Sequence, residues 1–148
     1  MDDINKLMSA YAADRLAQAG LNGRNKERVF DTLAAAGITA VYVDFDGEGD
    51  SGQINNVIAF RGEERAEFPQ ASVKIERVSY QSAQPSFGEC TIEEAIETLC
   101  YGYLEETHGG WENNDGAYGK FRFDVVRLAI ELEFNGRFTD IFTQNHSF

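Results

Sequence analysis

Alternating apolar and polar residues in the second half of the chain constrain the fold more than any other feature. Residues 118–125 and 128–134 alternate with the two-residue period of a β-strand, and only Val126 and Arg127 separate them. Residues 38–45, rich in β-branched and aromatic side chains, and residues 53–61 read as two more strands. The sequence therefore predicts two β-hairpins.

Helical periodicity surrounds these hairpins. We predict helices at residues 3–19 and 26–36, separated by a break at Leu21-Asn22-Gly23, and a third helix from Ile92 to about Thr107. Thr91 and Glu94 have the spacing of a capping box at the start of that third helix. A further strand is predicted at residues 73–80 and a loop at 81–88. The order ααβββαββ indicates a single α+β domain over residues 1–148, with an antiparallel sheet of about five strands and helices on one face.

The charge balance narrows the classes of partner. The 148 residues include 25 acidic and 13 basic side chains, which gives a net charge of −12. Binding to DNA or RNA needs clustered Lys and Arg, so we expect no direct contact with nucleic acid. We also expect no membrane span, because the chain has no long apolar run. Cys90 and Cys100 lie too far apart along one predicted helix for a disulfide, and the simplest compartment is the cytoplasm.

A first glycine-rich loop, at residues 46–52, follows a strand and gathers carboxylates. Alternate residues of an extended chain point to the same side, so the four acids from position 44 to position 50 are expected to converge. Such oxygen clusters suit Ca²⁺ or Mg²⁺. The EF-hand pattern fails, because Asn55 stands where a bidentate Glu belongs. The alternative is a solvated hairpin loop that holds no cofactor. The candidate binding residues of this loop are Asp44, Asp46, Glu48, Asp50 and Ser51.

A second glycine-rich loop, at residues 108–119, contains the single tryptophan of the chain. A tryptophan in such a loop serves either as a binding platform or as a lid over the end of the core. His108 with the nearby carboxylates would make an acid/base or metal set, but a histidine at a helix C-terminus also suits the helix dipole. No residue is assigned a catalytic role. The candidate binding residues of this loop are Trp111, Glu112, Asn113, Asn114 and Asp115.

Together the two loops carry a resemblance. Residues 49–54 (GDSGQI) and 110–116 (GWENNDG) resemble motifs of a family of small uncharacterised bacterial proteins encoded on plasmids, integrative elements and phages. The similarity spans most of the chain, from the second predicted helix to residues 138–140. The resemblance implies a protein that modulates a host or rival system. It supplies no catalytic residue.

Three functional hypotheses follow. The first is a non-catalytic interaction protein that binds, and in one form inhibits, a protein with a basic surface, because a strong negative field steers toward such surfaces. The second is a divalent-cation-dependent binding module or hydrolase built from both loops. The third is an assembly subunit whose interface would use exposed phenylalanines. The oligomeric state is left open. The candidates for that interface are Phe68, Phe87, Phe142 and Phe148.

Overall fold

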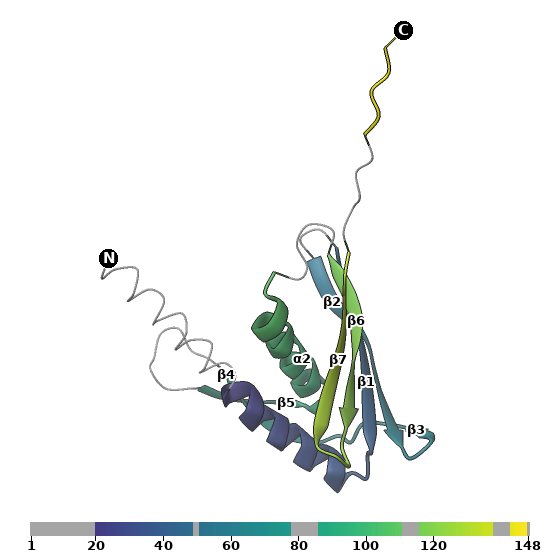
Figure 1. The fold of residues 1–148 in the computed structure, drawn as a ribbon. Coiled ribbons are helices and arrows are strands. Elements are labelled where there is room, and N and C mark those ends of the chain that lie inside the picture. The colour runs from purple at the N-terminus through teal and green to yellow at the C-terminus, as the bar shows by residue number, and fades with distance from the viewer. Residues whose placement is uncertain (1–19, 49–50, 78–85, 111–115, 138–142, 148) are drawn as a thin grey trace, which may run out of the picture.

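Seven strands and two helices make up the described part of the chain (Figure 1). This computed structural model describes residues 20–48, 51–77, 86–110, 116–137 and 143–147. A first helix covers residues 20–35, and the second, α2, covers Ile92–His108. The strands are β1 (Ala40–Glu48), β2 (Ser51–Arg61), β3 (Glu64–Ala66), β4 (Ser72–Arg77), β5 (Ser86–Thr91), β6 (Ala117–Asp124) and β7 (Ala129–Gly136).

Five of these strands form one antiparallel sheet in the order β3-β2-β1-β6-β7. Strand β1 lies at the centre, with β2 on one side and β6 on the other. Both predicted hairpins, β1–β2 and β6–β7, are confirmed. Strands β4 and β5 form a separate two-stranded sheet. The class is α+β with an antiparallel five-stranded sheet, as the sequence predicted.

Both helices cover the same face of the five-stranded sheet (Figure 1). The Phe30 ring of the first helix lies 6.0 Å from the Phe123 ring of β6, measured between ring centroids. On α2, the Tyr103 ring lies 6.5 Å from the Phe121 ring. The opposite face of the sheet is open in the described part of the chain, and we call it the open face. The fold therefore has one helical layer on one sheet.

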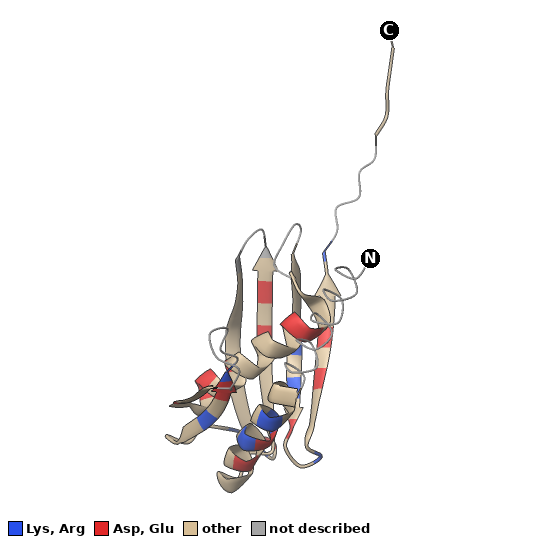
Figure 2. Ribbon diagram, turned by 90° about the vertical axis from the view of Figure 1, so that its left-hand side faces the viewer, with Lys and Arg blue, Asp and Glu red and all other residues tan. Residues whose placement is uncertain are grey.

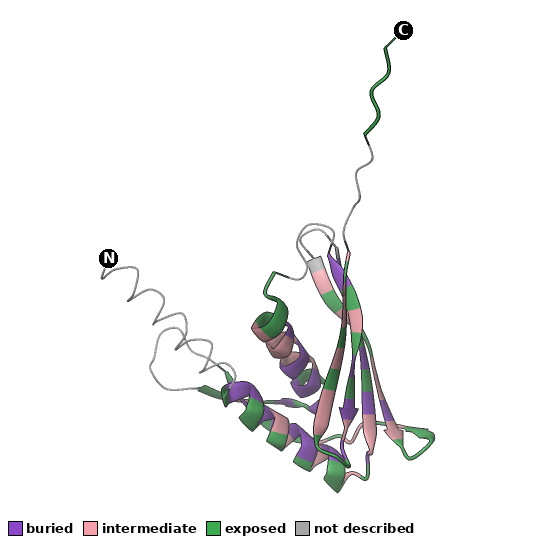
Figure 3. Cartoon of the chain, viewed as in Figure 1, coloured by how far each residue is buried: buried purple, intermediate pink, exposed green. Residues whose placement is uncertain are grey.

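Burial along β1 follows the predicted two-residue period (Figure 3). Val41, Val43 and Phe45 are buried against the helices, whereas Tyr42 and Asp44 are exposed on the open face. Apolar side chains every second residue account for this, since successive side chains of a strand point to opposite faces. The predicted helical stripe of α2 is also in the core, where Ile92, Ala95, Ile96 and Leu99 are buried.

The predicted capping box at the start of α2 is confirmed. The Glu94 amide donates to the Thr91 hydroxyl oxygen at 3.2 Å, and the Thr91 hydroxyl donates to the Glu94 carboxylate at 3.2 Å. The first bond satisfies one of the amides that a helix start leaves without a partner. Thr91 thus fixes where the chain changes from β5 to α2.

The predicted break at Leu21-Asn22-Gly23 is wrong, because residues 20–35 form one continuous helix. Tertiary contacts outweigh the low helix propensity of Asn and Gly here. The Asn22 side chain donates to a Glu106 carboxylate oxygen at 3.0 Å, across to α2. A Cβ at Gly102 of α2 would lie 2.6 Å from the Asn22 side-chain oxygen, so glycine at 102 is what lets the two helices approach. The earlier helix predicted at residues 3–19 lies outside the described residues.

The structure also changes the predicted loops. The loop predicted at 81–88 is wrong at its end, because residues 86–88 begin β5, which pairs over its whole length with β4. Cys90 therefore lies in β5 and not in a helix. The first glycine-rich loop is shorter than predicted, since β1 runs to Glu48 and β2 starts at Ser51. Strand β3 was not predicted, because the short, charged segment Glu64–Ala66 shows no strand pattern.

Neither helix, over the residues that are described, combines the length and apolarity needed to cross a bilayer.

Candidate functional site

The two glycine-rich loops leave the sheet at the same end. In the β1–β6 pair, Gly47 lies opposite Ala117 and Asp46 lies opposite Tyr118. The end of β1, the start of β2 and the start of β6 are therefore neighbours at one end of the sheet (Figure 1). We call the described residues there, Asp46, Gly47, Gly116, Ala117, Tyr118 and Arg137, the loop end of the sheet.

Arg137, which follows β7, holds this end together. Its guanidinium forms a two-pronged contact with Asp46, with Nη1 at 2.9 Å from Oδ1 and Nη2 at 3.2 Å from Oδ2. Nη1 also donates to the carbonyl oxygens of Gly47 at 3.1 Å and Ala117 at 3.4 Å. The guanidinium carbon lies 4.8 Å from the centre of the Tyr118 ring, on which it stacks. The backbone amide of Arg137 donates to the Gly116 carbonyl at 2.9 Å.

The contact with Arg137 determines which cation the Asp46 carboxylate binds. Paired donors of an arginine match both oxygens of a carboxylate, and such contacts are stronger than a single hydrogen bond. Both oxygens of Asp46 accept from Arg137, so the cation beside this carboxylate is a side chain of the same protein. No local pattern points to this partner, because Arg137 lies 91 residues further along the chain.

Asp44 lies on the open face, on the same side of β1 as Asp46, as the alternation predicted. Its neighbours across the strands are Asn56 on β2 and Lys120 on β6. Glu48 and Ser51 face each other as the last pair of the β1–β2 hairpin. Asp50 and residues 111–115, which include Trp111, Glu112, Asn113, Asn114 and Asp115, lie outside the described residues. Their predicted role in binding stays a prediction.

A metal site at the loops also stays a prediction. Within the described ranges, no group of three or more His, Cys, Asp or Glu side chains is placed to hold a metal ion. Asp50, Glu112 and Asp115 fall outside those ranges. Of the acids in the first loop, Asp46 is bound to Arg137.

His108, in the last turn of α2, stacks on the Phe134 ring of β7. The centroids of the two rings are 3.7 Å apart and their planes differ by 4°. The place of His108 in the last turn of α2 is the one that the sequence predicted. The contact also fixes the C-terminal end of α2 above the β7 edge of the sheet.

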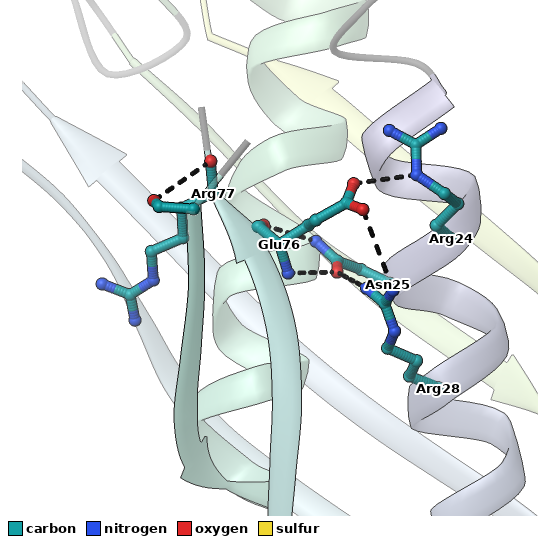
Figure 4. A network of polar contacts seen from close by, with 6 residues as sticks. Arg24, Asn25, Arg28, Glu76 and Arg77 are labelled. Carbon is teal, nitrogen blue, oxygen red and sulfur yellow. Dashed lines mark hydrogen bonds and ion pairs between the residues drawn. The ribbon is translucent and has the colours of Figure 1, made fainter. Parts of the chain in front are cut away.

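The most buried carboxylate of the described core belongs to Glu76 of β4, which is 5% exposed (Figure 4). Arg24 Nε lies 2.8 Å from one carboxylate oxygen, and Arg28 lies 3.8 Å from the other. The Asn25 side chain accepts from the Glu76 amide at 2.8 Å and donates to the Glu76 carbonyl at 3.0 Å. The network attaches β4 to the first helix, with contacts to both oxygens of the Glu76 carboxylate and to its backbone amide and carbonyl. We assign it a structural role.

Two buried thiols and one tyrosine have altered acidity. Burial raises the pKa of Cys100 well above its ordinary value, and the carboxylate of Glu97 adds to the effect. Burial also raises the pKa of Cys90, with a contribution from Glu94. For Tyr103, burial and then the Glu106 carboxylate raise the hydroxyl pKa to about 12. Both cysteines are free. These shifts disfavour the reactive thiolate, so neither cysteine has the character of a nucleophile.

Acidic residues recur along α2, and Figure 2 marks Asp and Glu in red on the ribbon. The helix contains five glutamates and neither lysine nor arginine. Among the ion pairs of the described residues, none joins a lysine or arginine to Glu93, Glu94, Glu97 or Glu105. We call these four residues the acidic helix surface. Glu93, Glu94 and Glu105 are exposed and Glu97 is half-buried.

Of the phenylalanines proposed for an assembly interface, Phe87 is 49% exposed and Phe68 is half-buried against the core. Lys74 and Arg28 approach the Phe87 ring at 4.9 Å and 5.2 Å, so cationic groups of the same chain occupy its surroundings. Phe142 and Phe148 lie outside the described residues.

Comparison with known proteins identifies a family. Residues 21–148 match the model of a family of unknown function, DUF6878, so the chain belongs to that family. No curated protein and no solved structure matches the chain. The family membership covers both loops, the sheet and α2, and it brings no assigned activity.

Proposed function

We propose that this protein is a non-catalytic acidic interaction protein that binds a basic surface of a partner protein. The observation that carries the proposal is the acidic helix surface on α2. Its four glutamates, three exposed and one half-buried, have no ion pair to any lysine or arginine of the described residues. Unpaired charges of one sign on one side of a helix attract a partner of the opposite sign.

The placement of the basic side chains supports the same proposal. Arg24 and Arg28 bind Glu76, and Arg137 binds Asp46. These three guanidinium groups therefore neutralise acids within the protein and leave the acidic helix surface uncompensated. Glu93, Glu94 and Glu105 are exposed, so a partner can reach this part of the negative charge.

The finer form of the proposal comes from the sequence motifs. Their resemblance to proteins of plasmids, integrative elements and phages supports a host or defence protein as the partner, and inhibition as the outcome. Competition with nucleic acid for a basic surface is one concrete form, since carboxylates spaced along a helix present a row of negative charge as a phosphate backbone does.

Capture from a bacterial lysate tests the proposal. The bait is the full chain. It is compared with the α2 variant of the same chain, Glu93→Gln/Glu97→Gln/Glu105→Gln, which leaves the Glu94 cap intact. The matched control, Glu63→Gln/Glu64→Gln/Glu67→Gln, removes the same charge from exposed positions at and after the β2–β3 turn. We expect a basic protein to be retained by wild type and control at about 0.15 M salt, and to be lost from the α2 variant. Retention of no protein under these conditions, or equal retention by all three baits, contradicts the proposal.

A further inference from the structure

Strand β7 forms one edge of the five-stranded sheet, and among the described residues this edge is regular and unpaired (Figure 1). All eight of its residues pair with β6, and no strand of the described ranges pairs with its other side. The opposite edge is different. There, the short strand β3 pairs only with Ala59, Phe60 and Arg61 of β2. The β1–β2 register also shifts at Asp44/Phe45, so β2 is an irregular strand.

We propose that β7 receives an extended segment of the basic partner as an added strand of the sheet. This inference rests on the proposed function and names how the partner is held. An edge strand presents a row of backbone N–H and C=O groups at regular spacing, and an extended peptide satisfies them by strand addition.

The side chains of β7 define the chemistry of that segment. Glu131 and Glu133 are exposed on the open face. On the other face, Ile130, Leu132 and Phe134 are half-buried against the core cluster. Side chains directly opposite one another on neighbouring strands interact, and opposite charges or apolar pairs stabilise the pairing. The added strand therefore carries Lys or Arg at alternate positions, with apolar residues between them.

The same charges disfavour a second copy of the chain as the occupant. Suppose that two copies of β7 pair antiparallel, with Leu132 at the centre and both open faces on the same side. Glu131 of each copy then lies opposite Glu133 of the other. Like charges directly opposite each other destabilise a strand pair. Charge complementarity thus selects a basic segment from another protein.

A synthetic peptide tests the inference on the full-length protein. The probe alternates lysine and valine, has blocked ends, and is about as long as the eight residues of β7. A second peptide has the same sequence with an N-methyl group on every other amide, which keeps the charge but removes the donors of one edge. Titration calorimetry gives the Kd, and hydrogen exchange resolved to the β7 amides gives the location. We expect the first peptide to bind and to slow exchange in β7, and the N-methylated peptide not to bind.

Two matched variants separate this inference from the proposed function. Glu131→Gln/Glu133→Gln removes two charges from β7, and Glu93→Gln/Glu97→Gln removes two from the acidic helix surface. We expect the β7 variant to weaken peptide binding by about tenfold and the α2 variant to leave it within about twofold. The Glu133 pair with Lys120 is exposed on both sides (61% and 59%), so its loss leaves the fold intact.

The other outcomes overturn the inference. Equal binding of the N-methylated peptide, with weakening only in the α2 variant, would leave the proposed function standing and remove β7 as the site. Absence of peptide binding would also remove β7, while lysate capture decides the proposed function separately. A concentration-dependent dimer with slowed β7 exchange in the protein alone would assign the edge to a second copy.

Discussion

Arg137 and Asp46 are joined by two contacts, Nη1–Oδ1 at 2.9 Å and Nη2–Oδ2 at 3.2 Å. The pair connects the residue after β7 to the end of β1, on strands separated by β6. The same guanidinium bonds carbonyl oxygens of Gly47 and Ala117, which flank the two glycine-rich loops. One arginine thus ties together the end of the sheet from which both loops emerge.

The first prediction concerns Arg137. Its replacement by lysine removes the paired geometry but keeps the charge, and lysine cannot reproduce a two-pronged contact. We expect the free energy of unfolding to fall by about 1 kcal/mol, since both side chains are partly exposed and solvent screens the pair. Urea denaturation measures the change. The control is Arg127→Lys, whose side chain is 84% exposed in its ion pair with Asp124 and for which we expect less than about 0.5 kcal/mol. Equal effects at the two positions would contradict the role given to Arg137.

The same pair bears on the metal hypothesis. Because Arg137 engages both oxygens of Asp46, we expect millimolar Ca²⁺ or Mg²⁺ to leave the Tm of the protein unchanged. A ligand that binds the native state raises the Tm, so a thermal scan with and without each ion is sufficient. A rise in Tm that is lost in Asp50→Asn would instead establish the loops as a cation site.

The next prediction concerns the contact between the two helices at Gly102 and Asn22. Alanine at 102 gains helix propensity but places its Cβ 2.6 Å from the Asn22 side-chain oxygen. We expect Gly102→Ala to destabilise the protein by about 1–3 kcal/mol through this overlap. The double variant Asn22→Ala/Gly102→Ala removes the obstructing oxygen, so a double-mutant cycle is expected to show recovery. Additive losses would mean that the two residues do not limit the approach of the helices.

Asn25 gives a sharper stability test. Its side chain bonds both the amide and the carbonyl of Glu76, and both residues are buried. Asn25→Ala leaves two buried backbone groups without partners, and we expect a loss of about 2–4 kcal/mol. Asn56→Ala, on the open face, is the control and should cost less than about 0.5 kcal/mol. Similar midpoints in urea for the two variants would refute the account of the network in Figure 4.

The two thiols make a prediction about pH. Burial raises the pKa of both Cys100 and Cys90 in the folded state. The protonated thiols therefore favour the folded state, and their contribution is fully present below the unfolded thiol pKa of about 8.5 and is lost as the pH rises above it. We expect Cys100→Ala to flatten the fall in stability at alkaline pH. Native Cys100 should also resist a thiol reagent at pH 8 until urea unfolds the chain. Rapid labelling of the native protein would contradict the burial of Cys100.

Local sequence patterns predicted much of this fold. Thr91 and Glu94 marked the start of α2 because a capping box is a contact within one turn. The alternation of Val41, Val43 and Phe45 marked the buried side of β1 for a similar reason. Sequence patterns left open whether the two glycine-rich loops meet, and the pairing of Gly47 with Ala117 places their flanking residues together.

The features that sequence reasoning missed depend on distant partners. Strand β5 has a glycine and few apolar residues, and its partner β4 stabilises it as a strand. Helix continuity through Asn22 depends on Glu106, which lies 84 residues away. The partner of Asp46 lies 91 residues away, so a carboxylate predicted as a candidate ligand is bound within the protein. No local pattern encodes such contacts.

One measurement tests the central claim, that the acidic helix surface on α2 binds a basic partner, most directly. It is the Kd for the captured partner at about 0.05 M and 0.2 M salt, for wild type and for Glu93→Gln/Glu97→Gln/Glu105→Gln. We predict that salt weakens wild-type binding about tenfold or more, and that the variant binds weakly with little dependence on salt, because screening acts on charges that the variant no longer has. A Kd that neither salt nor the three substitutions change would contradict the account.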